Sequence, residues 1–274
     1  MDYFDRFSGV KHKKSYDEAT SLSLAVACDL AYKSKTMVST TVEDWGYTFH
    51  GFINVVKKPD IDTQCFVMSD EKNIVVVFRG SESLQDWFAN FQTVYDPGPL
   101  KNTKAHEGFQ DSLFPAVIGI TNFIDQASPS GKKIWITGHS LGGALSSLFA
   151  GMLLENEYSV YGLYTFASPR PGDGAFEKLL NKKVTGPHYR VVNFGDVVPH
   201  VPPEPFYSHP GKRIILKART KQRTKTSWWK ERINALKLFI KNTAQILDVG
   251  DNHRLSADDE SYIPRLIKDL ERNQ

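Results

Sequence analysis

The strongest constraint on the fold of this chain is a glycine-rich junction at residues 138–143, which read Gly-His-Ser-Leu-Gly-Gly. Residues 132–137 form a short apolar, β-branched run that predicts a strand, and residues 141–150 are small and helix-favouring. A serine at such a junction is typical of a strained turn at the end of a sheet. A β-carbon on a flanking glycine would collide with the strand or the helix. The junction therefore predicts that Ser140 is a nucleophile; the alternative is an ordinary glycine-rich turn.

Strands and helices alternate along most of the chain. Before the junction, the patterns indicate strands at 46–55, 63–68 and 74–78, with a hairpin turn at 69–73. Later, predicted helices at 109–124, 141–150 and 174–180 alternate with predicted strands around Ile134, at 162–166 and at 189–193. Helices are also expected at 16–32 and near 257–270. We therefore expect an α/β fold with a mostly parallel sheet and helices on both faces. The length of 274 residues and the hydrophobic content of 41% suit one domain over 1–274.

The overall charge is small but unevenly spread. A formal net charge of +3 implies no global attraction to nucleic acid, and no nucleic-acid partner is expected. Five basic residues occupy every second position from Lys217 to Lys225, so an extended chain would place them on one face. Residues 229–247 then carry an apolar stripe at helical spacing, expected to pack on the core rather than on a membrane. The alternative makes Lys217 to Lys241 a binding arm for an anionic membrane or nucleic acid.

Cysteine usage and the N-terminal region bear on the compartment. Cys28 and Cys65 are too few for a disulfide framework and lie in apolar stretches, so buried free thiols are expected, with a Cys28–Cys65 bridge as the alternative. The apolar stretch from Leu22 to Cys28 is too short to span a membrane and reads as part of a helix, although it faintly resembles a lipoprotein signal. With no transmembrane segment and no convincing signal peptide, we expect a cytoplasmic protein or one exported by another route.

A nucleophilic serine needs a histidine to accept its proton and a carboxylate to orient that histidine. In this type of fold the order along the chain is serine, acid, histidine. Asp196 follows the predicted strand 190–193 and lies at its carboxyl end, where such sheets keep their chemistry. Asp173 also follows a strand, but its neighbours place it at the start of a helix, so we interpret it as a helix cap.

Four histidines follow Ser140 in the sequence. His188 precedes its strand and so belongs to the wrong end of the sheet, and His200 is too close behind Asp196. His253 lies late in the chain, ahead of the final helix, where hydrolases of this topology carry the base. We therefore predict a triad of Ser140, Asp196 and His253; a surface or packing role is the alternative for any single histidine.

These residues belong to a series of ordered motifs that covers about two thirds of the chain. The series is Phe-Arg-Gly-Ser at 78–81, His-Glu-Gly-Phe at 106–109, the 138–143 junction, Thr-Phe-Ala-Ser-Pro-Arg at 165–170, Arg-Val-Val-Asn at 190–193 with Asp196 and Pro199, and His253. The series resembles the class 3 lipases, a family with the α/β-hydrolase fold that includes the filamentous-fungal triacylglycerol lipases. The resemblance implies an oxyanion hole made by Ser81, through its backbone N–H and hydroxyl, and by the backbone N–H of Leu141. It also implies a structural role for His209.

Two segments of the chain have their own interpretation. Residues 82–97 resemble the helical lid of the family, and one face at helical spacing carries Leu84, Trp87, Phe88 and Phe91. Water should hold that face closed, whereas a lipid surface could accept it; the alternative is an ordinary packed helix. Residues 204–250 are interpreted as a basic insertion, because 212–250 is longer and more basic than the fungal pattern.

The sequence thus favours a serine carboxylic ester hydrolase, a lipase that hydrolyses acylglycerols through an acyl-enzyme. Its expected partner is a lipid or ester substrate at a lipid–water interface. A phospholipase A1, a feruloyl esterase or an acyltransferase on the same scaffold is the alternative, and a non-catalytic lipase-like binding module is a further one. No metal or organic cofactor is implied, because no cluster of His, Cys and carboxylate residues has ligand spacing.

Overall fold

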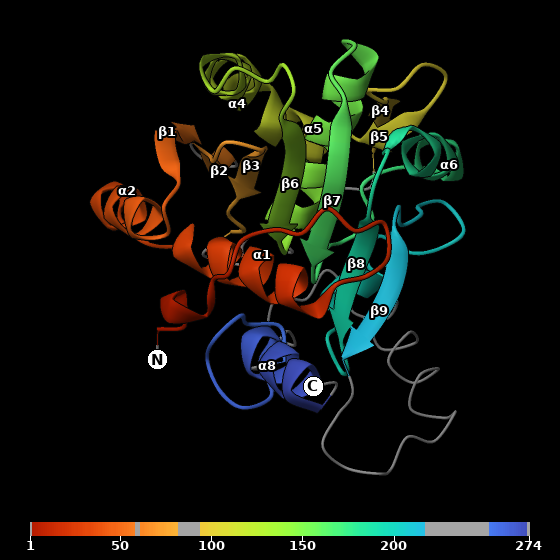
Figure 1. Cartoon of the computed structure of the whole chain (residues 1–274). Coiled ribbons are helices and arrows are strands. Elements are labelled where there is room, and N and C mark those ends of the chain that lie inside the picture. The colour runs from red at the N-terminus through yellow and green to blue at the C-terminus, as the bar shows by residue number, and fades with distance from the viewer. Residues whose placement is uncertain (1, 58–60, 82–93, 217–251, 273–274) are drawn as a thin grey trace.

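A seven-stranded sheet forms the centre of the molecule (Figure 1). The computed structural model describes residues 2–57, 61–81, 94–216 and 252–272. The strands of this sheet are β1 Thr48–Lys57, β2 Ile61–Ser69, β3 Asn73–Phe78, β6 Lys133–His139, β7 Val160–Phe166, β8 His188–Asn193 and β9 Lys212–Leu216, and they lie side by side in that order. The first three pair antiparallel, and β3, β6, β7, β8 and β9 pair parallel. A separate antiparallel ribbon contains β4 Tyr95–Pro97 and β5 Lys104–His106.

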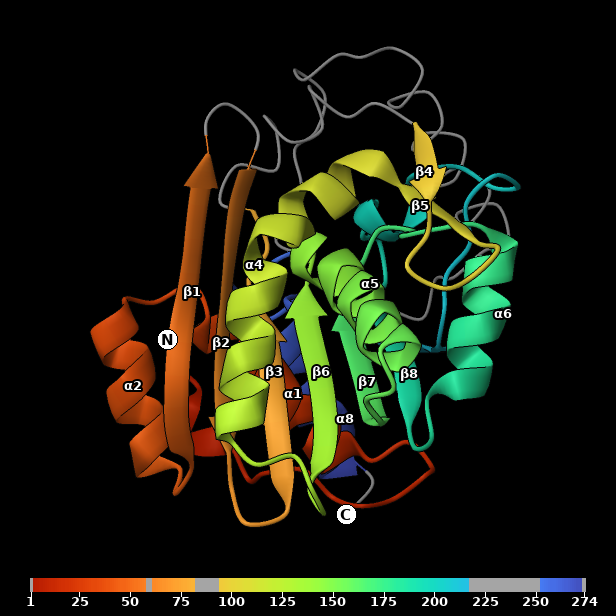
Figure 2. The same cartoon turned by 90° about the horizontal axis from the view of Figure 1, so that it is seen from above.

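Helices cover both faces of the sheet, as Figure 2 shows. On one face lie α1 Glu18–Leu30 and α8 Tyr262–Arg272, and on the other lie α4 Glu107–Gln126, α5 Leu141–Glu155 and α6 Gly174–Lys183. α2 Lys35–Asp44 packs beside β1. Two short 3-10 turns, η1 Phe4–Arg6 and η2 Val198–His200, complete the described elements. The mostly parallel sheet between two helical layers is the arrangement predicted from the sequence.

The strand β3 shows how the sheet separates two hydrophobic cores. All six of its residues are buried. Val75 and Val77 belong to the core beneath α1 and α8, and Ile74, Val76 and Phe78 belong to the core beneath α4 and α5. Successive side chains of a strand point to opposite faces, so a strand covered on both sides reads as an unbroken apolar run.

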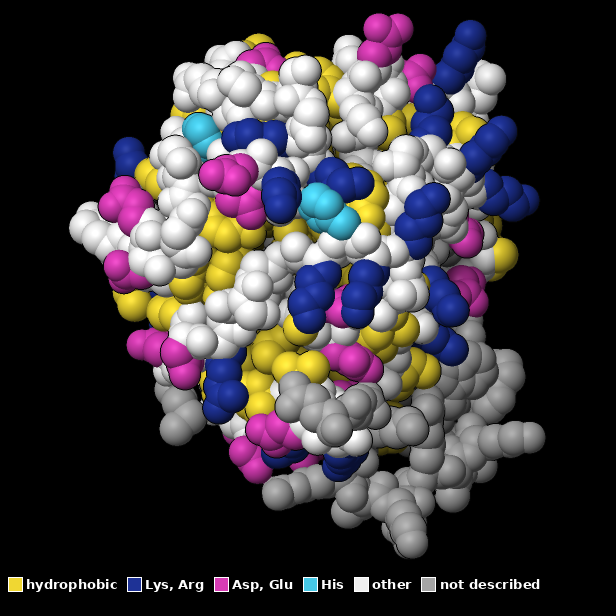
Figure 3. Space-filling view, in the orientation of Figure 1, with side chains coloured by type: hydrophobic (Ala, Val, Ile, Leu, Met, Phe, Trp, Pro, Cys, Tyr) yellow, Lys and Arg dark blue, Asp and Glu magenta, His cyan; other side chains and the backbone are white. Residues whose placement is uncertain are grey.

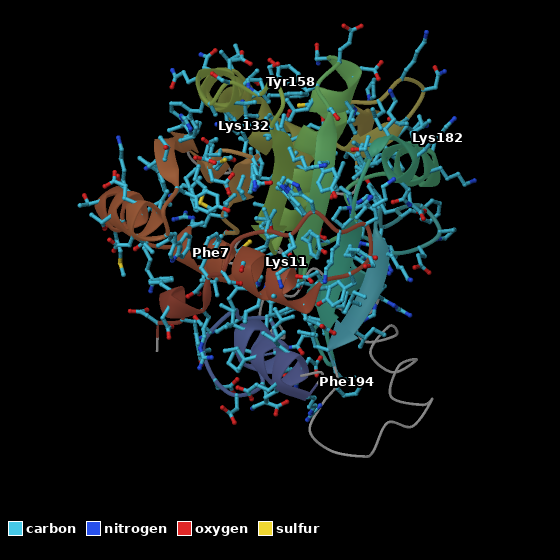
Figure 4. All side chains as sticks on the ribbon, viewed as in Figure 1. Phe7, Lys11, Lys132, Tyr158, Lys182 and Phe194 are labelled. Atoms are coloured by element: carbon cyan, nitrogen blue, oxygen red, sulfur yellow. The ribbon has the colours of Figure 1, made fainter. Side chains whose placement is uncertain are left out.

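The parallel strands place their carboxyl ends at one edge of the sheet. Figure 4 shows this polarity: Phe194, just after β8, lies beside α8, whereas Lys132, before β6, and Tyr158, before β7, lie at the opposite edge. Loops that leave the carboxyl ends of different strands therefore meet near α8, at the edge where α/β sheets hold their functional groups.

The strands and helices predicted within the described residues are present, with ends shifted by a few residues. The helical spacings at 84–91 and 229–247 lie outside the described residues. Six described elements were not predicted, namely α2, the edge strand β9, the two strands of the β4–β5 ribbon and the 3-10 turns η1 and η2. β9 falls within residues 204–250, the predicted basic insertion, of which 217–250 lie outside the described residues. Cys28 and Cys65 are both buried and free, as expected.

Surface charge is distributed unevenly over the face in Figure 3. Lys and Arg side chains gather on the right of this view, over α6 and β9, which contribute Lys182, Lys183, Lys212 and Arg213. Acidic side chains are more frequent on the left of the view. Within the described ranges, no helix is both long and apolar enough to cross a membrane.

Candidate active site

Ser140 occupies the turn between β6 and α5 in a strained conformation, with φ 56° and ψ −129°. Its side chain is almost fully buried, and its N–H donates to the carbonyl of Phe166 at 2.9 Å. The flanking glycines permit this turn. A β-carbon on Gly138 would lie 2.2 Å from the carbonyl oxygen of Gly142, and one on Gly142 would lie 2.5 Å from that of Phe78. The strand, the turn and the helix are thus pressed together at distances that only glycine allows.

Ser140, His253 and Asp196 form a continuous hydrogen-bonded chain. Nε2 of His253 lies 3.0 Å from Oγ of Ser140, and Nδ1 lies 3.0 Å from each carboxylate oxygen of Asp196. All three side chains are buried. Because a carboxylate only accepts, Nδ1 of His253 carries the hydrogen and Nε2 is left to accept the serine proton.

The carboxylate of Asp196 is held from two further directions. The backbone N–H of Val198 donates to Oδ1 at 3.0 Å, and the hydroxyl of Tyr262 on α8 donates to Oδ2 at 2.7 Å. Burial, followed by the charge of Asp196, raises the pKa of Tyr262 well above its ordinary value, so the phenol keeps its proton. These two donors hold the carboxylate in place opposite Nδ1 of His253.

His253 lies in a loop that is fixed by residues distant in the sequence. The side-chain amide of Asn193, at the end of β8, donates to the carbonyls of Asn252 at 2.8 Å and Glu260 at 2.6 Å. The hydroxyl of Ser256 donates to Asp29 of α1 at 2.8 Å. β8 and α1 therefore hold the loop on both sides of the imidazole.

The end of β3 lies directly against the turn that carries Ser140. A β-carbon on Gly80 would lie 2.8 Å from the carbonyl oxygen of His139 and 3.0 Å from Cβ of Ser140. Ser81, the next residue, is half-buried. Leu141 is the first residue of α5, and an N–H at this position has no acceptor within its own helix. Ser81 and Leu141 thus flank the serine from the strand side and the helix side.

The other predicted residues fall in three groups. His188 begins β8, away from Ser140, and His209 donates from Nε2 to the carbonyl of Pro199 at 2.6 Å. Burial lowers the pKa of His209 well below its ordinary value. Asp173 caps α6 by accepting from the N–H of Phe176 at 2.8 Å, as interpreted from the sequence. Leu84, Trp87, Phe88 and Phe91 lie outside the described residues.

Sequence reasoning missed three polar residues around the triad: Tyr32, Asn193 and Tyr262. Each lies in an element predicted for its apolar pattern. Asn193 also ends the 190–193 motif, but the motif alone predicts no role for its side-chain amide. His139 lies within the 138–143 junction, but the sequence predicts no separate role for it. Across the described ranges, no group of three or more His, Cys, Asp or Glu side chains is arranged to hold a metal ion.

A mostly parallel sheet with a buried serine, histidine and aspartate at its carboxyl edge defines the α/β-hydrolase class. Within this class, residues 75–206 match the family model described as Lipase (class 3). Over these residues the chain is similar to the class 3 lipase family.

Proteins similar to this chain include fungal lipases. The chain is 40% identical to a lipase of Rhizomucor miehei over 168 residues, which covers 57% of this chain and 45% of the relative. It is 34% identical to secreted mono- and diacylglycerol lipase 1 of Fusarium solani over 142 residues, covering 50% of this chain and 42% of the relative. The chain thus spans less than half the length of these two relatives.

Solved structures agree with the fold. The triacylglyceride lipase of Rhizomucor miehei superimposes with a TM-score of 0.62 at 28% identity, covering 74% of this chain and 82% of that structure. A lipase of Rhizopus microsporus var. chinensis superimposes with a TM-score of 0.61 at 25% identity, covering 80% and 82%. These likenesses confirm the predicted α/β-hydrolase fold.

Proposed function

We propose that this chain is a serine-dependent carboxylic ester hydrolase that acts on acylglycerols. The observation that carries the proposal is the buried hydrogen-bonded chain from Ser140 through His253 to Asp196, with 3.0 Å between the serine oxygen and the imidazole nitrogen. The printed names of the relatives support the substrate class, since they include a triacylglyceride lipase and a mono- and diacylglycerol lipase.

In the proposed reaction, Oγ of Ser140 attacks the ester carbonyl while Nε2 of His253 takes the serine proton. Asp196 stabilises the imidazolium that forms. The carbonyl oxygen becomes an oxyanion, which accepts hydrogen bonds from Ser81 and from the N–H of Leu141. As the tetrahedral intermediate collapses, the bond to the alcohol breaks and His253 protonates the departing alkoxide. Water, deprotonated by His253, then attacks the acyl-enzyme, and the carboxylic acid leaves Ser140.

The test compares Ser140→Ala with a remote serine variant, Ser112→Ala, on p-nitrophenyl esters and on emulsified triglyceride. Ser112 lies on α4, where its hydroxyl donates to the carbonyl of Gly108. We expect Ser140→Ala to lose several orders of magnitude in kcat while remaining folded, and Ser112→Ala to retain activity. A Ser140→Ala protein that still hydrolyses esters would refute the proposal. Activity on phospholipid or transfer to an alcohol, without hydrolysis of acylglycerols, would point to a phospholipase or an acyltransferase.

We further propose that residues 82–97 act as a lid that opens at a lipid surface, with Leu84, Trp87 and Phe88 contacting lipid or substrate. The support is the apolar face that these residues share with Phe91 at helical spacing, directly after Ser81. Trp87→Ala should depress turnover on emulsified long-chain ester far more than on a dissolved short-chain ester, because only a lipid surface offsets exposure of that face. Equal losses on both substrates would assign Trp87 to packing.

A further inference from the structure

His139, the residue before Ser140, uses both nitrogens of its ring. Nε2 lies 2.7 Å from the backbone carbonyl oxygen of His253, and Nδ1 lies 3.0 Å from the hydroxyl of Tyr32, in the turn just after α1. The side chain is buried, with 5% of its surface exposed. The hydroxyl of Tyr32 also accepts the backbone N–H of Gly80 at 3.1 Å.

These contacts allow one pattern of hydrogens. A carbonyl oxygen only accepts, so Nε2 of His139 must carry the ring hydrogen. Nδ1 is then an acceptor, and the hydroxyl of Tyr32 must donate to it. The oxygen of Tyr32 still has a lone pair for the N–H of Gly80. His139 is therefore held as the neutral tautomer protonated on Nε2.

The resulting chain joins three parts of the site that come from distant segments of the sequence. Gly80 immediately precedes the oxyanion candidate Ser81, His139 immediately precedes Ser140, and the carbonyl belongs to His253 itself. The approach at Gly80 is close, because a β-carbon there would lie 2.4 Å from the hydroxyl oxygen of Tyr32. A shift of any one segment would break a hydrogen bond in a buried environment, which destabilises the arrangement.

We propose that Tyr32 and His139 are positioning residues for acyl transfer, which hold the backbones of Gly80 and His253 in fixed relation to Ser140. The inference rests on the proposed function, since it assumes that Ser140 and His253 carry out the reaction. Neither residue contacts the ester; both act through the residues that do.

The proposal requires His139 to stay neutral while His253 gains a proton. The two imidazole centroids are 4.8 Å apart, so a charge on His139 would oppose the imidazolium at His253. Burial, followed by the charge of His253, lowers the pKa of His139 well below its ordinary value. Among the described residues, the titratable and charged groups around the pair are Cys28, Asp29, Arg79, Asp196, His253 and Tyr262.

The first test removes one oxygen atom. Tyr32→Phe keeps the ring but deletes the donor to His139 and the acceptor for Gly80. We expect kcat on a dissolved p-nitrophenyl ester to fall about tenfold with KM little changed, the loss that follows from about one hydrogen bond. The matched control is Tyr161→Phe, a buried tyrosine of the same core at the start of β7, which should match the wild type.

The second test separates hydrogen bonding from packing at position 139. His139→Gln places an amide N–H near the original Nε2, whereas His139→Met has similar length and no donor. We expect the Gln variant to retain most of kcat and the Met variant to lose about tenfold. Thermal unfolding of both proteins shows whether they remain folded. A purely structural role would lower both variants alike.

The third readout is the acid limb of kcat/KM. Loss of the Tyr32 hydroxyl removes a hydrogen bond to neutral His139, so protonation of His139 becomes easier. In Tyr32→Phe we therefore expect kcat/KM to fall at acid pH with the uptake of two protons rather than one. In the double variant Tyr32→Phe/His139→Gln, the fall should again follow the uptake of one proton.

Three results would each overturn the proposal: a Tyr32→Phe enzyme that behaves like Tyr161→Phe, equal kcat in the Gln and Met variants, or an unchanged acid limb in Tyr32→Phe. Ser140→Ala is measured in parallel. If Ser140→Ala remains active, the proposed function itself fails. If it is inactive while Tyr32→Phe is normal, only this inference fails.

Discussion

Two regions present the triad, and they are held in opposite ways. The turn at residues 138–143 is fixed by close contacts between backbone atoms, both within the turn and with the end of β3. The loop at residues 252–261, which carries His253, is held by hydrogen bonds with side chains from α1, β6 and β8. In the turn, the backbone atoms lie so close together that an added atom has no room. In the loop, the loss of each separate hydrogen bond lowers the free energy of unfolding by about 1 kcal/mol. The turn should therefore fail abruptly on mutation and the loop gradually.

The most damaging change should be a methyl group in the turn. In Gly138→Ala or Gly142→Ala, the new β-carbon would lie within 2.5 Å of a backbone oxygen, so either the strand or the helix must move. We expect a loss of at least about 3 kcal/mol in the free energy of unfolding, or no folded protein. Chemical denaturation measures it. Gly174→Ala is the control, since its β-carbon would lie 3.7 Å from the nearest atom, and a change there above about 1 kcal/mol would contradict the crowding argument.

The loop should be most sensitive at Asn193, which satisfies two of its carbonyl groups. Asn193→Ala leaves the carbonyls of Asn252 and Glu260 without this donor in a buried site, and we expect a loss of about 2 kcal/mol in stability together with a lower kcat. Denaturation and initial rates on a dissolved ester check both effects. Asn156→Ala, at an exposed position after α5, is the control. A stable, fully active Asn193→Ala would show that the loop holds His253 without β8.

A single outer contact of the loop should have a smaller effect. Ser256→Ala removes the hydrogen bond to Asp29, so we expect a loss of about 1 kcal/mol in stability and a decrease of a few-fold in kcat. Asp29→Asn retains an acceptor for the Ser256 hydroxyl and should be milder than Asp29→Ala. If the Asn and Ala variants were equally impaired, the charge of Asp29 rather than its hydrogen bond would matter.

The smallest expected effect is on the pH dependence of stability, and it comes from His188 at the edge of the sheet opposite the triad. Burial lowers the pKa of His188 to about 3, and both of its ring nitrogens are inaccessible. In the unfolded chain His188 takes up a proton near pH 6.5, whereas in the folded protein it does not. The contribution of neutral His188 to the free energy of unfolding is therefore complete above that pH and is lost as pH falls toward 3. Between pH 7 and pH 6 this amounts to about 0.7 kcal/mol.

His188→Gln should flatten the dependence of the unfolding free energy on pH in that range, with His12→Gln at an exposed position as the control. An unchanged slope in His188→Gln would mean that His188 titrates normally in the folded protein. The comparison also separates the roles of two histidines. His188 only limits stability at acid pH, whereas the neutral state of His139 is proposed to matter for turnover.

Local sequence patterns predict much of this fold. The turn at Ser140 follows from six residues, and the helix cap at Asp173 follows from its neighbours. By contrast, α2 and β9 are among the elements that were missed, because α2 has only two buried residues and β9 is a short edge strand with basic residues. Their structure depends on packing against β1 and pairing with β8 rather than on a strong local pattern.

The sequence alone determined the order of the elements, the strained turn and the candidate serine, aspartate and histidine. These follow from local sterics and from the alternation of strands and helices, which are written within short windows of the chain. Only the tertiary structure decided which polar groups surround the triad. Tyr32, His139 and His253 meet across separations of 107 and 114 residues, and Tyr262 reaches Asp196 across 66. No periodic pattern records such contacts, because a buried hydroxyl finds its partner through the packing of whole elements.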